Sequence, residues 1–215
     1  MRSEPESGGQ KRRSFIEDAR RAQIIESAIE TFAELGYVNT SLARIAERAG
    51  ISKGVISYHF AGKSELMEQI VEQIYREMGE FVAPRLAEQV TATGAMRAHI
   101  RSIAEYVRGH RAQLLALGEI FNNLRDSDGQ PRYGIAFDEP LYQRQEGVFR
   151  MGQQTGEFRT FDARVMAVTV QAAIDSMFAY WATYPDHDLE AHANELADLF
   201  EHAIRAEGPG ETEHR

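Results

Sequence analysis

Apolar residues recur at helical spacing along most of this chain, and no segment shows the sustained alternation of apolar and polar residues that a half-buried strand gives. The first such stretch runs from Ile16 to Leu35, where Gly36 ends it, and Pro84 ends a later one. Glycines, prolines and short polar loops separate the predicted helices, which we place at 16–35, 41–48, 52–59, 63–82, 93–108, 111–124, 139–155, 162–183 and 188–206. The sequence therefore predicts an all-α fold of about nine helices.

The composition of the 215 residues narrows the possible classes of function. The absence of cysteine excludes disulfides, thiolate zinc sites and cysteine nucleophiles, and it fits a reducing compartment. No uninterrupted apolar run approaches the ~20 residues that span a bilayer, and Met1 to Arg13 lack the apolar stretch of a signal peptide. We therefore expect a cytoplasmic protein that makes no membrane contact.

The net charge of −9 is distributed unevenly along the chain. Residues 1–63 carry ten Lys/Arg and eight Asp/Glu, whereas the rest carries fourteen and twenty-five. DNA affinity depends on local contacts with phosphates rather than on the charge of the whole chain. An acidic second part is therefore compatible with DNA binding by the first.

Residues 42–60 have the pattern of two short helices that cross closely. Ala46 is small where the second helix passes, Gly50 can adopt the left-handed conformation that ends the first helix, and Ser52 can cap the next. Ile51 fills the corner, and Ile45, Ala49 and Ile56 face inward. An ordinary helical hairpin uses the same residue types, but the pattern favours a DNA-binding helix-turn-helix.

The flanking residues extend this pattern. The run from about 19 to 79 resembles the DNA-binding domain of the tetracycline-repressor (TetR) family in several linked features: Gly36, Thr40-Ser41, Ile45-Ala46, Ala49-Gly50-Ile51-Ser52, Tyr58, Phe60 and Lys63. One departure is Ser57, where many members carry an aromatic residue, and this affects local base contacts rather than the fold.

The resemblance implies a role for each residue on the DNA-facing side. Residues expected to approach base edges from the recognition helix are Ser52, Lys53, Gly54, Val55 and Ser57. Residues expected to contact phosphates are Thr40, Ser41, Tyr58, His59 and Lys63, with the outward-facing Arg44 as a further candidate. Thr40 and Ser41 can equally serve as N-caps of the second helix.

The resemblance weakens after about residue 80. We expect 1–18 to form a flexible tail and the start of helix one, 19–79 the DNA-binding domain, 80–207 a ligand-binding and dimerisation domain, and 208–215 a tail. The helix at 162–183 is apolar nearly all round and the last helix is amphipathic, which suits a two-fold interface with two helices from each subunit. The expected interface residues are Ile174, Met177, Trp181, Leu189, Ala193, Leu196, Phe200 and Ile204. A purely internal core is the alternative.

A ligand pocket is expected among the helices that surround the central cavity of TetR proteins. Its candidate residues are Met96, Ile103, Tyr106, Phe121, Tyr142, Phe149, Met166 and Phe178, each of which could equally be plain core. Gln171 and Asp175 are polar residues in an apolar helix, so they need partners or a wet cavity. Asp175 can accept from a cationic ligand, or from a neighbouring arginine or backbone group.

Other patterns carry no site. The loop around Asp126 lacks acidic residues at both ends of a calcium loop, and His187 and His192 are five residues apart rather than on one helical face. There is no phosphate loop or nucleophile elbow, so we expect neither enzyme activity, nor a cofactor, nor a metal. Lys11, Arg12 and Arg13 form either a DNA-binding arm or a solvated tail.

These features predict a homodimeric repressor that releases a near-palindromic operator when a small hydrophobic or cationic effector binds. One alternative is a TetR-like DNA-associated factor controlled by a protein partner, and another is an all-α enzyme with an incidental helix-turn-helix.

Overall fold

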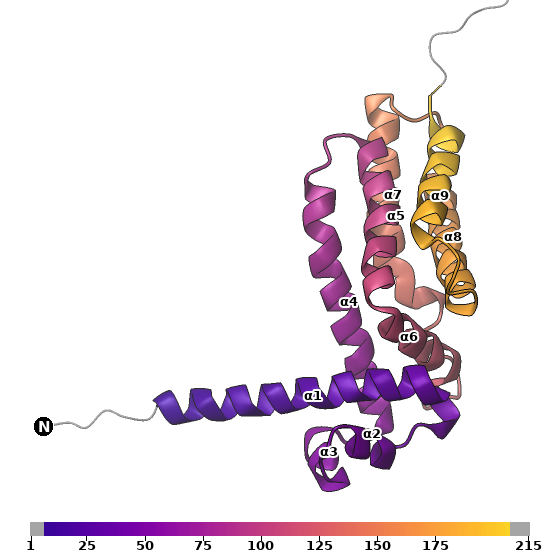
Figure 1. Ribbon diagram of the computed structural model, residues 1–215. Helices are drawn as coiled ribbons and strands as arrows, with labels where there is room; N and C mark the ends of the chain where they lie inside the picture. The colour runs from indigo at the N-terminus through magenta and orange to yellow at the C-terminus, as the bar shows by residue number, and fades with distance from the viewer. Residues whose placement is uncertain (1–6, 207–215) are drawn as a thin grey trace, which may run out of the picture. The chain divides into compact units, whose positions relative to one another are not determined.

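The computed structural model describes residues 7–206, with side chains from Ile16 onward. The elements are α1 (Ser7–Asn39), α2 (Leu42–Arg48), α3 (Lys53–His59), α4 (Lys63–Ala87), α5 (Ala92–Gly109), α6 (Arg111–Asn123), a 3-10 turn η1 (Ile135–Asp138), α7 (Glu139–Thr155), α8 (Ala163–Thr183) and α9 (Leu189–Ile204) (Figure 1). Residues 7–206 contain isolated β-bridges but no strand. The predicted all-α fold is therefore confirmed.

The chain divides into two compact units, and α4 and α6 each contribute to both. The first unit comprises Met1–Tyr75 and Leu115–Arg132, and the second comprises Arg76–Leu114 and Tyr133–Arg215. The sequence did not indicate that the end of α6 belongs with the N-terminal helices. The functional division between residues 79 and 80 stays a prediction.

The first unit is a small helical core. Helix α1 runs across α2, and α2 packs against α3 (Figure 1). Fully buried side chains from successive helices fill its interior, among them Ile24, Phe32, Ile45, Ile56 and Phe60. The predicted corner is confirmed, because Gly50 has a φ of 65° and the Ser52 Oγ accepts a hydrogen bond from the Val55 N–H.

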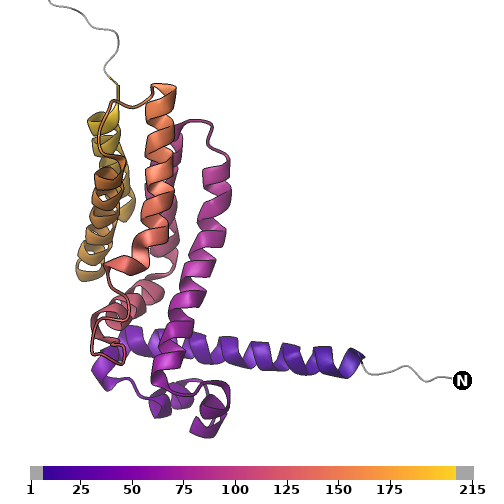
Figure 2. The same cartoon turned by 180° about the vertical axis from the view of Figure 1, so that it is seen from behind.

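The second unit is a bundle. Helices α5, α9, α8 and α7 each pack on two neighbours and so close a ring. Figure 2 shows α7 beside α8 and α9. One face of α8 contributes to its core, including Val170, Ile174 and Met177. By length and composition alone α8 could cross a bilayer, a property that it shares with core helices of this kind.

Two predicted helix ends were wrong. Helix α4 continues past Pro84 to Ala87, because proline lacks only its own N–H donor and the Glu88 N–H still donates to the Pro84 carbonyl. Helix α1 begins at Ser7 rather than at Ile16, and the Ile16 side chain is exposed because burial in α1 begins at Ile24. Residues 1–6 of the predicted N-terminal tail, all of the predicted tail at 208–215, and the side chains of Lys11, Arg12 and Arg13 lie outside the described residues.

Candidate nucleic-acid interface and ligand cavity

Helix α3 presents a polar face to solvent. Ser52, Lys53, Gly54, Ser57 and Tyr58 are exposed, with 75% of the Tyr58 surface accessible. The opposite side is anchored by the fully buried Ile56. Val55 and His59 are half-buried at the edges of the exposed face. A short helix fixed on one side, with small polar residues on the other, has the form that enters the major groove of DNA.

The residues that begin α2 have different roles. Ser41 is the N-cap, and its side chain accepts a hydrogen bond from the Arg44 N–H. Thr40 is buried, and its hydroxyl lies 2.7 Å from the Gly36 carbonyl, to which it donates. The phosphate contact predicted for the Thr40 side chain is therefore wrong, because this hydroxyl is already satisfied inside the fold.

Lys63 is also directed into the protein. Its Nζ donates to the Tyr37 carbonyl at 2.7 Å and lies 3.9 Å from the centre of the Tyr37 ring. Burial lowers the pKa of Lys63. Lys63 therefore holds the turn between α1 and α2, and because an ammonium has two further N–H donors, its predicted phosphate contact stays a prediction.

The same turn is held from α6. Gly36 has a φ of 71°, which favours glycine, and the following Tyr37 N–H donates to Glu119 Oε2 at 2.6 Å. Sequence reasoning missed Glu119, because it is 82 residues from its partner and has no local signal. Together Lys63 and Glu119 fix the direction in which α1 leads into α2.

Most basic side chains of the first unit are paired. Arg48 forms ion pairs with Glu30 and Glu34, and Arg21 donates to the His59 carbonyl at 2.6 Å. Within the described residues, the side chains of Arg44 and Lys53 are exposed and make no hydrogen bond or ion pair. These two cations are therefore available to phosphates or base edges.

Most of the predicted dimer residues are buried within one subunit. This holds for Ile174, Met177, Trp181, Leu189, Ala193 and Ile204, while Leu196 and Phe200 are half-buried against the same core. A second copy cannot cover the six buried side chains any further, whereas Leu196 and Phe200 keep exposed surface, so the predicted dimer face stays a prediction for these two. Different apolar side chains of α8 and α9 are exposed, among them Val165, which is 62% accessible, and Leu199, which is 65% accessible.

A cavity of about 40 Å³ lies in the second unit, between α4, α5, α7 and α8. Its lining includes Leu86, Met96, His99, Gln145, Phe149 and Val170. Of the predicted ligand residues, Met96 and Phe149 line it, and Gln171 reaches it through a hydrogen bond to Gln145 at 2.9 Å. Below we call this space the ligand cavity.

The remaining predicted ligand residues lie elsewhere. Ile103 and Phe178 are buried in the core of the second unit, and Met166 is packed against that core. The Tyr106 hydroxyl donates to Gln113 at 2.7 Å, and Phe121 belongs to the first unit. None of these five side chains lines the ligand cavity, because each is already packed or bonded within its own unit.

Tyr142 and Asp175 belong to an acidic region next to η1. Burial and the nearby Asp175 carboxylate raise the pKa of Asp138 to about 6. The pKa of Tyr142 is also raised, first by burial and then by the charges of Asp138 and Asp175. Asp175 accepts from Gln171 at 2.9 Å, so the partner that it needed is an amide rather than an arginine.

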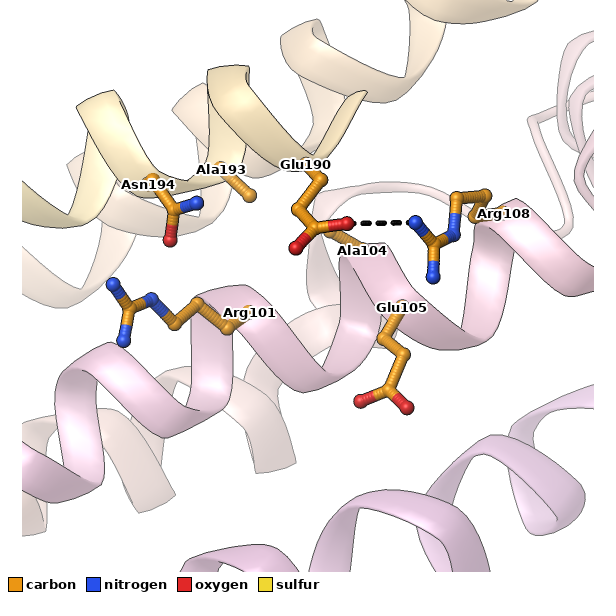
Figure 3. A pocket seen from close by; sticks show the side chains of 7 residues that line it. All are labelled: Arg101, Ala104, Glu105, Arg108, Glu190, Ala193 and Asn194. Carbon is orange, nitrogen blue, oxygen red and sulfur yellow. Dashed lines mark hydrogen bonds and ion pairs between the residues drawn. The ribbon is translucent and has the colours of Figure 1, made fainter. Parts of the chain in front are cut away.

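A larger groove, of about 490 Å³, runs between α5 and α9 (Figure 3). Ala104 and Ala193 form its buried floor, and Arg108 and Glu190 join across it at 2.7 Å. Arg101 and Asn194 stand on its two sides. Because charged side chains form its walls and its apolar floor consists of two alanines, this groove does not suit an apolar ligand.

His187 and His192, whose spacing in the sequence does not fit a metal site, face each other. His187 Nε2 and His192 Nδ1 are 2.9 Å apart because His187 precedes α9 rather than lying on it. Among the described residues there is no group of three or more His, Cys, Asp or Glu side chains that could hold a metal ion.

Residues 24–70 match the family model described as bacterial regulatory proteins, tetR family. The chain is 40% identical over 90 residues to the HTH-type transcriptional regulator BetI 1 of Chromohalobacter salexigens, covering 42% of this chain and 43% of that relative. The chain thus matches less than half the length of this relative.

Two solved structures share the fold. One is a putative transcriptional regulator from Saccharomonospora viridis in complex with choline, with a TM-score of 0.74, 23% identity and coverage of 88% of this chain and 100% of that one. The other is FadR from Bacillus subtilis in complex with stearoyl-CoA, with a TM-score of 0.71, 24% identity and coverage of 86% and 99%.

Proposed function

Because this chain belongs to the tetR family of bacterial regulatory proteins, we propose that it is a cytoplasmic transcriptional regulator that binds double-stranded DNA through α3. The observation that carries the proposal is the anchored helix α3, with Ile56 buried on one side and Lys53, Ser57 and Tyr58 exposed on the other. Lys53 and Ser57 read base edges, and Tyr58 contacts the backbone.

We further propose that two copies of the chain bind a near-palindromic operator. The exposed stripe of α8 supports this arrangement, since Val165, Thr169, Ala172, Ser176 and Tyr180 follow one another at intervals of three or four residues. Most of these side chains are small, so a second helix can approach closely. With Leu199 on α9 they form the interface that we assign, in place of the buried residues predicted from the sequence.

The second unit supplies a site for a small-molecule effector, and binding of that effector releases the operator. The apolar lining of the ligand cavity and the acidic region at Asp138 and Asp175 support a hydrophobic or cationic effector. A coupling of about 1–3 kcal/mol changes operator affinity about 5–150-fold, and DNA weakens effector binding by the same factor. No enzymatic step is required by this account.

The proposal is tested by separating base contacts from phosphate contacts on α3. Operators are first selected from random DNA with the full chain. Lys53→Ala is then expected to change the ranking of operator variants, because the Lys53 side chain is exposed and unpaired. Tyr58→Ala is expected to weaken binding to all operator variants about equally. Binding titrations over a salt series measure both effects, and identical behaviour of the two variants would refute this division of roles.

A further inference from the structure

Four polar side chains form a hydrogen-bonded chain through the second unit. Gln145 Nε2 lies 3.1 Å from His99 Nε2 and 2.9 Å from Gln171 Oε1. Gln171 Nε2 in turn donates to Asp175 Oδ1 at 2.9 Å. Only 7% of Gln145 and 6% of Gln171 are exposed, so these amides are held inside an otherwise apolar interior.

Asp175, at one end of this row of hydrogen bonds, determines which atom of each side chain donates and which accepts. A carboxylate only accepts hydrogen bonds, so the nitrogen of Gln171 faces Asp175 and its oxygen faces Gln145. The oxygen of Gln171 then requires a donor, which is the Gln145 nitrogen. The Gln145 Oε1 atom is left as an acceptor, and it is buried without a hydrogen-bond partner among the described residues.

His99 closes the other end of the chain. Because Gln145 donates to it, His99 Nε2 accepts, and the ring proton lies on Nδ1. Burial, assisted by the charge of Arg144, lowers the pKa of His99 to about 4, which keeps the ring neutral at pH 7. The same surroundings disfavour any other positive charge beside Gln145.

We propose that Gln145 Oε1 binds the head group of the effector, and that this head group is a neutral hydrogen-bond donor of the kind an alcohol carries on an apolar body. The ligand cavity of about 40 Å³ has room for a hydroxyl group, and Gln145 lines it together with Met96, Phe149 and Val170. Because the Oε1 atom is itself buried, the Gln145 side chain must turn for the head group to reach it. A carboxylate or ether oxygen would place an acceptor against an acceptor. This inference rests on the proposed function in taking the second unit as the effector site.

The test uses 1-hexanol and its isomer butyl ethyl ether, which has the same atoms but no donor. Both are titrated into the full chain, and their affinities are measured from NMR chemical shifts. The alcohol is expected to bind about 10-fold more tightly, because the ether leaves the buried acceptor unsatisfied. Hexanoate, which is acceptor-only, is expected to bind more weakly than hexanol.

Two variants on α7 locate the acceptor. Gln145→Met is expected to bring the ratio of the two affinities to about 1, since the acceptor is removed at similar side-chain length. Gln143→Met is the matched control, because Gln143 is exposed and bonds only Glu139. This control is expected to keep the preference for the alcohol.

Equal affinities of the wild type for alcohol and ether would overturn the inference, since water alone would then satisfy Gln145. So would an alcohol preference that survives Gln145→Met, or a preference for hexanoate. If Gln145→Met does not fold, the wild-type ratio and the shift of the Gln145 side-chain amide protons decide the matter. Selective alcohol binding without any effect on DNA would contradict the proposed regulation and leave this inference standing.

Discussion

Leu199→Glu is expected to turn the proposed dimer into a monomer and to lower operator affinity by about 100-fold or more, because each half-site alone supplies only part of the binding free energy. Leu199 is 65% exposed on α9, so a glutamate there is solvated in the single chain and buried only when a second copy covers it. Phe200, which the sequence favoured, is half-buried in the core, and its replacement would disturb the fold itself.

The control for this prediction is Val90→Glu. Val90 is 97% exposed between α4 and α5 in the same unit, so this variant adds the same charge away from the assigned interface. Sedimentation velocity gives the oligomeric state and a fluorescence titration gives the operator affinity. A Leu199→Glu protein that keeps its helical content, remains dimeric and binds operator normally would contradict the interface on α8 and α9.

Gly152→Ala is expected to destabilise the protein by about 3 kcal/mol, the upper part of the range for overpacked cores. A Cβ at position 152 would lie 2.1 Å from Cδ2 of the Phe158 ring, which is itself buried. The ring has little room to move, because its centre lies 6.2 Å from that of Phe149 and 6.4 Å from that of Phe161. Phe149, one of these two neighbours, also lines the ligand cavity.

Gly147→Ala is the matched control on the same helix. A Cβ there meets nothing within 4 Å, so the change is expected to stabilise α7 by about 1 kcal/mol through helix propensity. Urea unfolding of both variants measures the two effects, which have opposite signs. Equal stabilities would show that Phe158 does not pack on Gly152 as described.

The features that sequence reasoning predicted correctly are local ones. The corner of the helix-turn-helix depends on Gly50 and Ser52, whose φ angle and cap are determined within a few residues. Lys63 and Glu119 contact the α1–α2 turn from 26 and 82 residues away, and nothing in the local pattern distinguishes them from surface charges. The structural role of Lys63 was missed for that reason.

Predicting the ligand cavity and the dimer face required knowing which side of each helix is buried in the bundle. Helix α8 is apolar nearly all round, so its composition could not say which side the bundle would bury. The sequence did contain a signal for the buried position of Gln145. This residue lies in register with Tyr142, Phe149 and Gly152 on the buried side of α7, as Gln171 does among the apolar residues of α8.

The central claim is that α3 from two copies of the chain lies in successive major grooves of one operator. The chain has no cysteine, so Ser57→Cys creates a single attachment point on the exposed face of α3 for an iron chelate that cleaves nearby DNA. Gln154→Cys, on the exposed surface of α7, is the control. The account predicts two clusters of cleavage about 10 base pairs apart with Ser57→Cys, and none with Gln154→Cys. A bound complex in which Ser57→Cys cleaves at a single cluster, or not at all, would contradict it.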